Sequence, residues 1–237
     1  QPMPIKWLPH VYHASMTDMD RQMMERVREG DVGRDWSEIG RISAKSGGEW
    51  AFFEYHSGKF PDWPEQLMAF ELAQAEEALA RVSAESREPD QMIADNSGIP
   101  NPVSTEALTQ MMLGAPGTVY NGGLLRATVR YFDPERARSG LPEDVAALVD
   151  GLGRDHVAFH LVNLSPHQAR RIVVQAGAFG EHRFDHVQYD DGDGDGDVGV
   201  AANHLEVALP PGTSIRLRCG LDRFTNRPSY ALPWQGA

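Results

Sequence analysis

Aromatic and ionisable side chains are concentrated between residues 49 and 63 of the sequence. The polar members of this stretch are Glu49, Glu54, Tyr55 and His56, and its two indoles are Trp50 and Trp63. Carboxylic acids carry out the proton transfers of glycoside cleavage, and flat aromatic faces can stack on sugar rings. A phenol beside an imidazole adds a second acid and base. We therefore predict that the four polar residues are catalytic and that the two tryptophans bind substrate.

The same stretch has a second interpretation, which is a buried aromatic cluster between helices with both glutamates in solvent. The position of the stretch supports a site, because it follows Gly47-Gly48 and precedes a well-capped helix, so rigid neighbours would hold it. The acidic composition of this half of the chain suits a neutral or cationic ligand better than a polyanion. The expected ligand is a neutral carbohydrate or another small molecule.

A run of five carboxylates from Asp190 to Asp197 alternates with glycines. Asp191, Asp193 and Asp195 match the first half of the calcium-binding loop of an EF-hand. The twelfth position is Ala202 instead of glutamate, so a true EF-hand is excluded. The run is either an exposed hairpin loop, kept soluble by its charge, or a weak calcium site at these three residues. No cofactor is required by the sequence, and calcium is the one that the run could hold.

Histidines offer a weaker signal for metal chemistry. His156 and His160 share one face of an expected strand, and His182 and His186 are four residues apart on another. The His-x-His spacing of a cupin site, with its downstream glutamate, is absent. A cupin-like metal-dependent enzyme would therefore need histidines that converge from neighbouring strands. The sequence also lacks a phosphate-binding loop, a serine nucleophile elbow and a His-Glu-x-x-His motif.

Composition excludes several classes of protein. The chain has 237 residues, of which 41% are hydrophobic and 24% charged, and these proportions are typical of soluble globular domains. The net charge of −12 argues against a nucleic-acid partner. Apolar runs are shorter than the ~18 residues that a membrane span needs, so no membrane partner is expected. Cys219 is the only cysteine and cannot form an internal disulfide, and the cellular compartment stays open.

The first half of the chain has helical periodicity. Thr17 is an expected helix start, with Met19, Met23 and Val27 on one face, and a short helix is expected over residues 36–44. The clearest helix begins at Asp62, with Pro64 in its first turn and Glu65 at the capping-box position. The face expected to pack carries Met68, Leu72, Ala75, Leu79 and Val82. A further helix is expected from Ser104 to Gly114.

Apolar residues change to a period of two from Leu125 to Tyr131. A short helix is expected after Pro142, because Val145, Leu148, Val149 and Leu152 have helical spacing. Strands follow over residues 157–161, 171–175, 183–189, 205–209 and 215–219. We predict an α+β protein, with a helical segment over residues 1–118 and an antiparallel β-sandwich domain over residues 119–237.

Four segments carry a resemblance to a known class of enzyme: residues 47–56, the helix over 62–86, residues 161–166 and the tail Asn226 to Trp234. Helical hairpins followed by a sandwich resemble the C-terminal part of a carbohydrate-active enzyme built on an (α/α) barrel. The resemblance implies a glycoside hydrolase or lyase whose helical array contributes to the cleft, while the sandwich, closed by the tail as a terminal strand, braces the barrel. It also implies that the remainder of a longer polypeptide is a partner. The alternative is a non-catalytic sandwich module for ligand binding or assembly.

Overall fold

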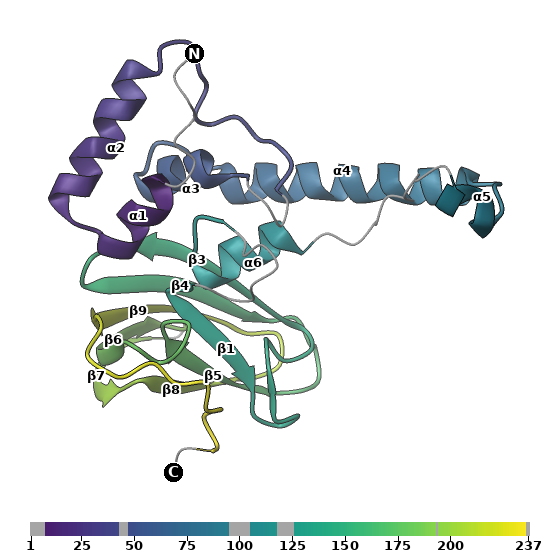
Figure 1. Ribbon diagram of the computed structural model, residues 1–237. Coiled ribbons are helices and arrows are strands. Elements are labelled where there is room, and N and C mark those ends of the chain that lie inside the picture. The colour runs from purple at the N-terminus through teal and green to yellow at the C-terminus, as the bar shows by residue number, and fades with distance from the viewer. Residues whose placement is uncertain (1–7, 43–46, 95–104, 118–125, 193, 236–237) are drawn as a thin grey trace.

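The computed structural model describes residues 8–42, 47–94, 105–117, 126–192 and 194–235. An N-terminal helical segment precedes two antiparallel sheets, so the predicted α+β class is confirmed (Figure 1). The helices are α1 (Leu8–Ser15), α2 (Asp18–Gly30), α3 (Glu49–His56), α4 (Trp63–Ala84), α5 (Pro89–Ala94) and α6 (Glu106–Leu113). The strands are β1 (Val129–Asp133), β2 (Arg138–Ser139), β3 (Val145–Leu152), β4 (His156–Asn163), β5 (Arg170–Ala176), β6 (Arg183–Asp190), β7 (Asp195–Ala202), β8 (His204–Leu209) and β9 (Ser214–Asp222).

The two sheets face each other across one apolar core. One sheet has the order β2-β1-β5-β8 and the other has the order β3-β4-β9-β6-β7. On β4, Val157, Phe159 and Leu161 are fully buried, whereas His156 and His160 lie on the opposite face of the strand. Cys219 lies on β9, and its buried thiol is part of the same core. The alternation in the sequence therefore identifies the inward face of the sandwich correctly.

The helix predicted after Pro142 is wrong, because residues 145–152 form strand β3. This strand pairs with β4 from Val145 opposite Asn163 to Leu152 opposite Val157, with a bulge after Val149. Val149 faces the sandwich core, whereas Leu148 packs against the helical segment. A strand that is covered on both faces loses the simple alternation of buried and exposed residues, and this explains the helix-like spacing.

The tail also differs from the prediction, because residues 223–235 form no strand. Pro228 and Pro233 remove two backbone donors that a strand would need. Side-chain and backbone hydrogen bonds fix the tail instead: the Asn226 amide donates to the carbonyl oxygen of His182 at 2.8 Å, and the Ser229 N–H donates to that of Phe179 at 2.9 Å.

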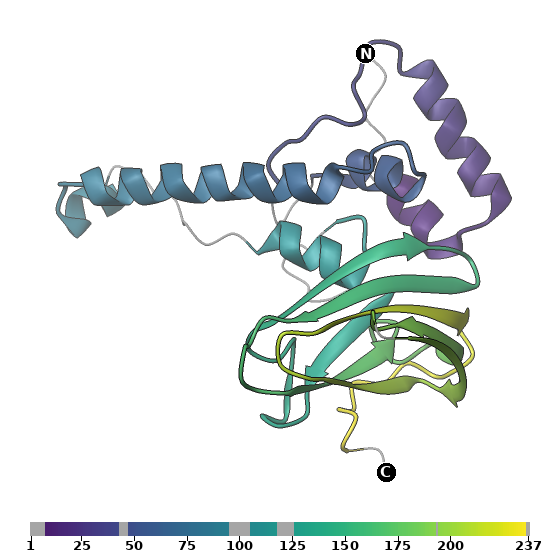
Figure 2. The ribbon, with the colours of Figure 1, turned by 180° about the vertical axis from the view of Figure 1, so that it is seen from behind.

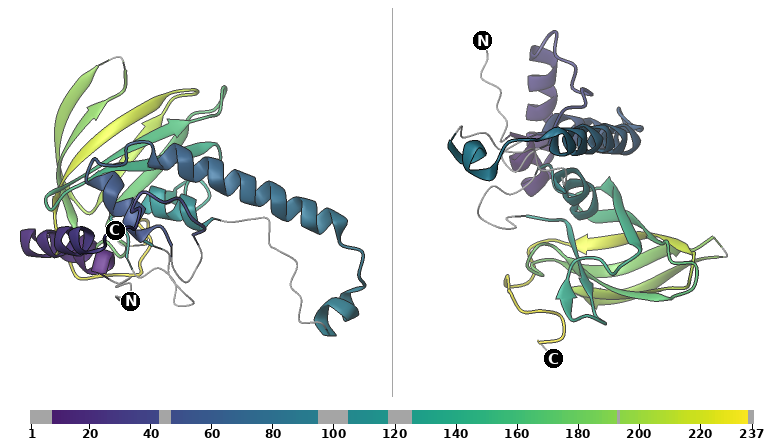
Figure 3. Two further views of the ribbon diagram at one scale, coloured as in Figure 1. Left: turned by 90° about the horizontal axis from the view of Figure 1, so that it is seen from above. Right: turned by 90° about the vertical axis from the view of Figure 1, so that its right-hand side faces the viewer.

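Helix α4 forms where the sequence predicts it, but it packs through a different face. Trp63, Leu67, Glu71 and Ala78 are buried, whereas the predicted packing residues Met68, Leu72, Leu79 and Val82 are 39%, 61%, 53% and 37% exposed. The buried row lies one residue before the predicted one, because Trp63 and Leu67 anchor the helix in the core of the helical segment. The helix extends past the sandwich, so much of its length has no neighbour among the described elements (Figure 1; Figure 3).

Two smaller helical predictions also need correction. On α2, whose Thr17 cap accepts the N–H of Asp20, Met19 and Met23 are exposed and Met24 is buried instead. Residues 36–42 form a turn and irregular backbone in place of a helix, and residues 43–44 lie outside the described part of the chain. Trp36 is buried there against Trp50.

Helix α6 joins the helical segment to the sandwich. It packs over β3, and the helices gather on this side of the sheets (Figure 2). The N–H of Thr128 donates to the carbonyl oxygen of Leu113 at 2.7 Å, and the Tyr131 hydroxyl donates to that of Met112 at 3.0 Å. The predicted domain boundary between residues 118 and 119 falls outside the described residues, so it stays a prediction.

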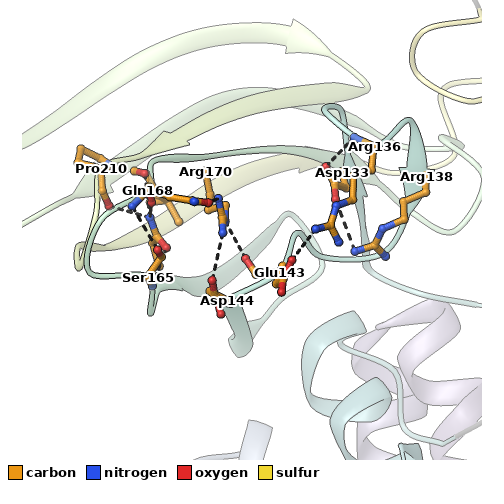
Figure 4. Close-up of polar contacts among 11 residues, drawn as sticks. Asp133, Arg136, Arg138, Glu143, Asp144, Ser165, Gln168, Arg170 and Pro210 are labelled. Carbon is orange, nitrogen blue, oxygen red and sulfur yellow. Dashed lines mark hydrogen bonds and ion pairs between the residues drawn. The ribbon is translucent and has the colours of Figure 1, made fainter.

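A polar network closes the opposite end of the sandwich core. The buried Asn163 amide donates to the carbonyl oxygens of Gln168, Leu209 and Pro210 at 2.8, 3.2 and 3.0 Å, and its oxygen accepts the Ser165 N–H at 3.0 Å. Arg170 donates to the Glu143 carbonyl oxygen and to the Asp144 carboxylate nearby (Figure 4). These bonds tie the end of β4 to the turn between β8 and β9.

No described helix combines the length and the apolar character that crossing a bilayer requires.

Candidate functional site

The predicted site residues lie on α3, a helix whose start depends on glycine. Gly48 caps α3 with a positive φ of 74°. A Cβ atom there would lie 2.8 Å from Ile42 Cδ1 and 2.9 Å from Gln110 Oε1, so a larger residue would displace these side chains and would also be strained by the positive φ. The helix has 3.6 residues per turn, and its consecutive side chains therefore point in different directions. As a result, the four predicted catalytic residues enter three separate environments.

Glu54 lines a pocket on the α2 side of α3. The pocket has a volume of about 360 Å³ and is lined by Arg28, residues 31–37 and Glu54. Glu54 is 4% exposed, and its Oε1 atom lies 3.8 Å from Arg28 Nε without a hydrogen-bond partner among the described residues. Burial raises the pKa of Glu54, while Lys59 and Arg28 act in the opposite direction. A carboxyl group with a raised pKa beside a pocket is typical of a general acid.

Two tryptophans stand beside this pocket. The rings of Trp36 and Trp50 are 4.2 Å apart between centroids, and Trp50 keeps partial exposure. Trp36 lines the pocket, and its buried Nε1–H has no acceptor within the described part of the chain. An indole with a free N–H next to a carboxyl group can both stack on a ligand and donate to it.

Trp63, the other predicted substrate-binding residue, occupies a different environment. It is 1% exposed, and its ring lies 5.7 Å from that of Phe52 and 5.1 Å from that of Tyr55. The alternative interpretation, a buried aromatic cluster, describes this position. Trp63 therefore packs against α3 through Phe52 and Tyr55, and its role in binding substrate stays a prediction.

Tyr55 faces the sandwich. Burial, and secondarily Asp150 on β3, raise the pKa of its phenol to about 12 against the opposing effect of Arg216 on β9. Asp150 also forms an ion pair with Arg216 at 2.9 Å. The phenol therefore stays protonated at neutral pH, where it can donate a hydrogen bond but cannot act as a base.

Glu49 and His56 face α1. One oxygen of the buried Glu49 accepts the N–H of Gly47 at 3.0 Å, and a side chain at Gly117 would touch both Glu49 and His10. His56 has both ring nitrogens buried without a partner in the described ranges, and burial lowers its pKa to about 3. A neutral, enclosed imidazole of this kind binds no proton near neutral pH.

Sequence reasoning found Glu54 but missed the other residues that line its pocket, above all Arg28 and Trp36. It also found Trp50, which contacts Trp36. The available signal was a lone tryptophan in a stretch rich in glycine and aspartate, residues 31–40, where a loop is more common than the predicted helix. His10 and His13, which meet α3 from the other side, carry no signal in their spacing.

The carboxylate run forms a hairpin, as one of its two interpretations predicts. Strands β6 and β7 pair from Asp190 opposite Asp195, and the Gly194 N–H donates to Asp191 Oδ1 at 3.0 Å. Asp193 lies outside the described residues, so the calcium site at Asp191, Asp193 and Asp195 stays a prediction. Among the described residues, no group of three or more histidine, cysteine, aspartate or glutamate side chains could hold a metal ion. The convergence that a cupin-like site requires is therefore not seen in this part of the chain.

Comparison with known proteins gives a family match for part of the chain. Residues 1–109 match the family described as a domain of unknown function, DUF8034. No curated protein matches in sequence.

Similar solved structures include a xyloglucanase of glycoside hydrolase family 44 from Paenibacillus polymyxa, with a TM-score of 0.25 and 13% identity over 32% of this chain and 17% of that chain. A putative α-N-acetylgalactosaminidase from Bacillus halodurans has a TM-score of 0.28 and 17% identity over 41% of this chain and 21% of that chain. The GH27 β-L-arabinopyranosidase of Geobacillus stearothermophilus has a TM-score of 0.25 and 14% identity over 39% and 19% of the two chains. The matches span about a fifth of these enzymes, and the resemblance is too weak to assign a fold or an activity.

Proposed function

We propose that this chain is the C-terminal part of a carbohydrate-active enzyme, a glycoside hydrolase or lyase. The pocket at Glu54 contributes to the cleft and binds a neutral saccharide, and the sandwich braces the helical segment. Glu54 is the general acid, which protonates the leaving oxygen, and Trp50 stacks against a sugar ring.

The observation that carries the proposal is the state of Glu54. Its carboxyl group is buried at a pocket, its Oε1 atom has no hydrogen-bond partner among the described residues, and burial raises its pKa. Leaving a buried polar atom unpaired costs about 1–3 kcal/mol, so such atoms are uncommon unless a ligand completes them. Asp35 lines the same pocket and also raises the pKa of Glu54, which provides a second carboxylate for acid–base work.

The exposed row of α4 supports the partner that this proposal implies, the remainder of a longer polypeptide. Met68, Leu72, Leu79 and Val82 follow one another in steps of four, seven and three residues, the spacing of a seam between packed helices. Exposed apolar rows of this length mark interaction surfaces in globular proteins. A further part of the enzyme packed on α4 would bury this row.

The test is turnover by the full-length protein of xyloglucan oligosaccharides and a panel of nitrophenyl glycosides. We expect Glu54→Gln to lower kcat by at least a hundredfold with little change in KM, because the amide preserves shape but carries no transferable proton. Glu76→Gln on the exposed side of α4 is the matched control and should keep the wild-type rate.

Wild-type turnover by Glu54→Gln would overturn the proposal. Binding of these sugars without turnover, lost in Trp50→Ala, would also overturn the catalytic assignment and would favour the non-catalytic ligand-binding module.

A further inference from the structure

Another pocket lies between the four-stranded sheet and the tail, and it has a volume of about 200 Å³. Strands β5 and β8 contribute Gln175 and His204 to its lining, the loop after β5 contributes Phe179 and Gly180, and the tail contributes Ser229 and residues 231–233. The helices lie above the sandwich in Figure 1 and the tail reaches below it. This tail pocket is therefore separate from the pocket at Glu54, with which it shares no lining residue.

Strand alternation directs two polar side chains away from the core and into the tail pocket. Val174 and Ala176 on β5 pack in the core between the sheets, so Gln175 points to the outer face. His204 is the residue of β8 directly opposite Gln175, and its neighbour Leu205 packs against the core. Gln175 is only 2% exposed, although it lies on an outer face. The tail and the loop after β5 therefore enclose these two side chains.

Hydrogen bonds fix the orientation of both side chains. The Gln175 amide N–H donates to the carbonyl oxygen of Gly177 at 3.1 Å, so its oxygen accepts from His204 Nε2, which is 3.1 Å away. His204 therefore carries a proton on Nε2. Burial lowers the pKa of His204, which keeps the ring neutral near pH 7. Its Nδ1 atom is then an acceptor, and it has no hydrogen-bond partner in the part of the chain that the structure describes.

A glycine leaves space between two amide side chains at this pocket. Gly180 has a positive φ of 67°, and a Cβ atom there would lie 3.0 Å from Asn203 Nδ2 and 3.7 Å from Gln175 Oε1. The Asn203 amide lines the pocket and has no hydrogen bond to any other described residue. Ser229 Oγ accepts the N–H of Ala231 at 3.0 Å, and its hydroxyl proton stays available to donate.

The chemistry of the lining selects the class of ligand. None of the described residues that line the pocket is charged at neutral pH, and its amides, imidazole and hydroxyl suit a ligand that both donates and accepts hydrogen bonds. Tyr230, between two lining residues, is 87% exposed, and its ring lies 5.1 Å from that of Phe179. The volume is below the ~300–1,000 Å³ of pockets for drug-sized ligands, so the ligand is a single small ring.

We propose that the tail pocket binds one neutral sugar ring, which Asn203 and His204 hold by hydrogen bonds to its hydroxyl groups while Tyr230 stacks on its rim. His204 Nδ1 accepts a hydroxyl proton, and the Asn203 amide donates to one hydroxyl and accepts from another. An aromatic ring can cover the apolar C–H face of a sugar. This is a binding site apart from the cleft at Glu54, and it does not depend on the chain being an enzyme.

The test is titration of the chain near neutral pH with methyl α-D-glucoside, methyl α-D-galactoside and methyl α-D-mannoside. Binding is followed by NMR through the imidazole protons of His204, which are identified by their absence from His204→Gln. We expect at least one glycoside to shift these signals with a dissociation constant of about 1 mM, because so small a ligand buries few atoms. A signal at His204 reports the tail pocket and not the pocket at Glu54.

Two variants and two controls locate the sugar. Asn203→Ala removes the amide and Tyr230→Ala removes the rim ring, and each should weaken binding about tenfold. The side chain of Tyr230 is almost fully exposed, so its removal should leave the fold intact. Phe224→Ala removes another exposed aromatic ring of the tail, one that does not line the pocket, and should bind as the wild type does. Trp50→Ala should also leave the titration unchanged.

The proposal is overturned if no glycoside shifts the His204 signals at about fifty times the expected dissociation constant. It is also overturned if Asn203→Ala and Tyr230→Ala both bind within about twofold of the wild type, or if glycerol binds as tightly as the sugars. Turnover tests Glu54 and the His204 signals test the tail pocket, so a failure here leaves the proposed function intact.

Discussion

The end of the sandwich at Asn163 and the region around α3 differ in whether their buried polar groups are hydrogen-bonded. At the end of β4, the two N–H groups of the Asn163 side chain are shared among three carbonyl oxygens, and its oxygen accepts one N–H. Across the described residues, eleven buried side-chain nitrogen or oxygen atoms have no hydrogen-bond partner, and nine of these belong to the helical segment. One of the nine, Glu54 Oε1, has only the ion pair with Arg28 at 3.8 Å. The other two belong to Arg126 and Asp150, which follow the helical segment in the chain. The charge of Arg126 lowers the pKa of His13, and the charge of Asp150 raises the pKa of Tyr55.

The difference indicates what each region is built to do. Strands satisfy their own backbone groups, so a few side chains such as Asn163 complete the hydrogen bonding where strands end. Around α3, unpaired atoms lower stability and bring no gain inside the folded chain. A ligand at Glu54 would pair with its Oε1 atom, and the proposed function follows from this contrast.

The largest effect that we expect comes from removing the hydrogen-bonded side chain of Asn163. Asn163→Ala leaves three carbonyl oxygens and one N–H without their bonds in a buried place. The Asn163 side chain contributes two N–H groups and one oxygen to these bonds, so at about 1 kcal/mol for each group the loss in the free energy of unfolding is about 3 kcal/mol, measured by urea denaturation. Gln188→Ala, which removes an exposed bond to Asp197, serves as the control and should cost less than about 0.5 kcal/mol. A cost below about 1 kcal/mol for Asn163→Ala would mean that the network does not stabilise the sandwich.

An intermediate effect is expected when the pH is lowered, because the buried ring of His56 has no hydrogen-bond partner among the described residues. The pKa of His56 is about 3 in the folded chain and 6.5 without burial, so between these values only the unfolded chain binds the proton. The stability that neutral His56 provides is complete above pH 6.5 and is lost as pH falls towards 3, by about 1.4 kcal/mol per pH unit. Urea denaturation at pH 6.5 and pH 5 should therefore differ by about 2 kcal/mol through His56.

The matched variants separate His56 from general acid effects. His56→Phe removes the titrating ring but fits among Phe52 and Tyr55, so it should reduce the acid loss by about 2 kcal/mol. His167→Gln, at an exposed position, should leave the loss unchanged. An acid loss of the same size in His56→Phe would show that the enclosed imidazole is not its source.

The smallest effect is expected at the hairpin between β6 and β7. Replacing residues 191–194 with Asn-Gly removes an exposed turn without packing, so the free energy of unfolding should change by less than about 0.5 kcal/mol. Adding a chelator should change neither the Tm of the parent nor the Tm of this variant. If the chelator lowers only the parent's Tm, calcium bound at Asp191, Asp193 and Asp195 stabilises the hairpin instead.

Local signals in the sequence predict most elements, and the errors occur where contacts between distant residues decide the outcome. Strand β4 and helix α4 follow from periodicity and capping, which are local. Strand β3 was mistaken for a helix because α6 covers its outer face, and α4 packs through the Leu67 row because distant residues such as Met111 meet that side. The choice between two adjacent rows of a helix is not encoded in its own periodicity.

The candidate site shows the same limit. Aromatic density identifies α3, which contributes Glu54 and Trp50. Arg28 and Trp36 reach the pocket from α2 and from the loop after it. Such groups meet only through folding, so residue spacing alone does not predict their partners.

The lone thiol of Cys219 makes the central strand β9 observable by chemical labelling. Its side chain is enclosed between the two sheets, and burial raises its pKa to about 12. Alkylating and disulfide reagents attack the thiolate, so the native thiol is shielded both by access and by protonation. The rate at which such a reagent modifies the chain therefore reports how often β9 separates from β4 and β6. A cysteine introduced on an exposed loop could be labelled selectively in the native state without first replacing Cys219.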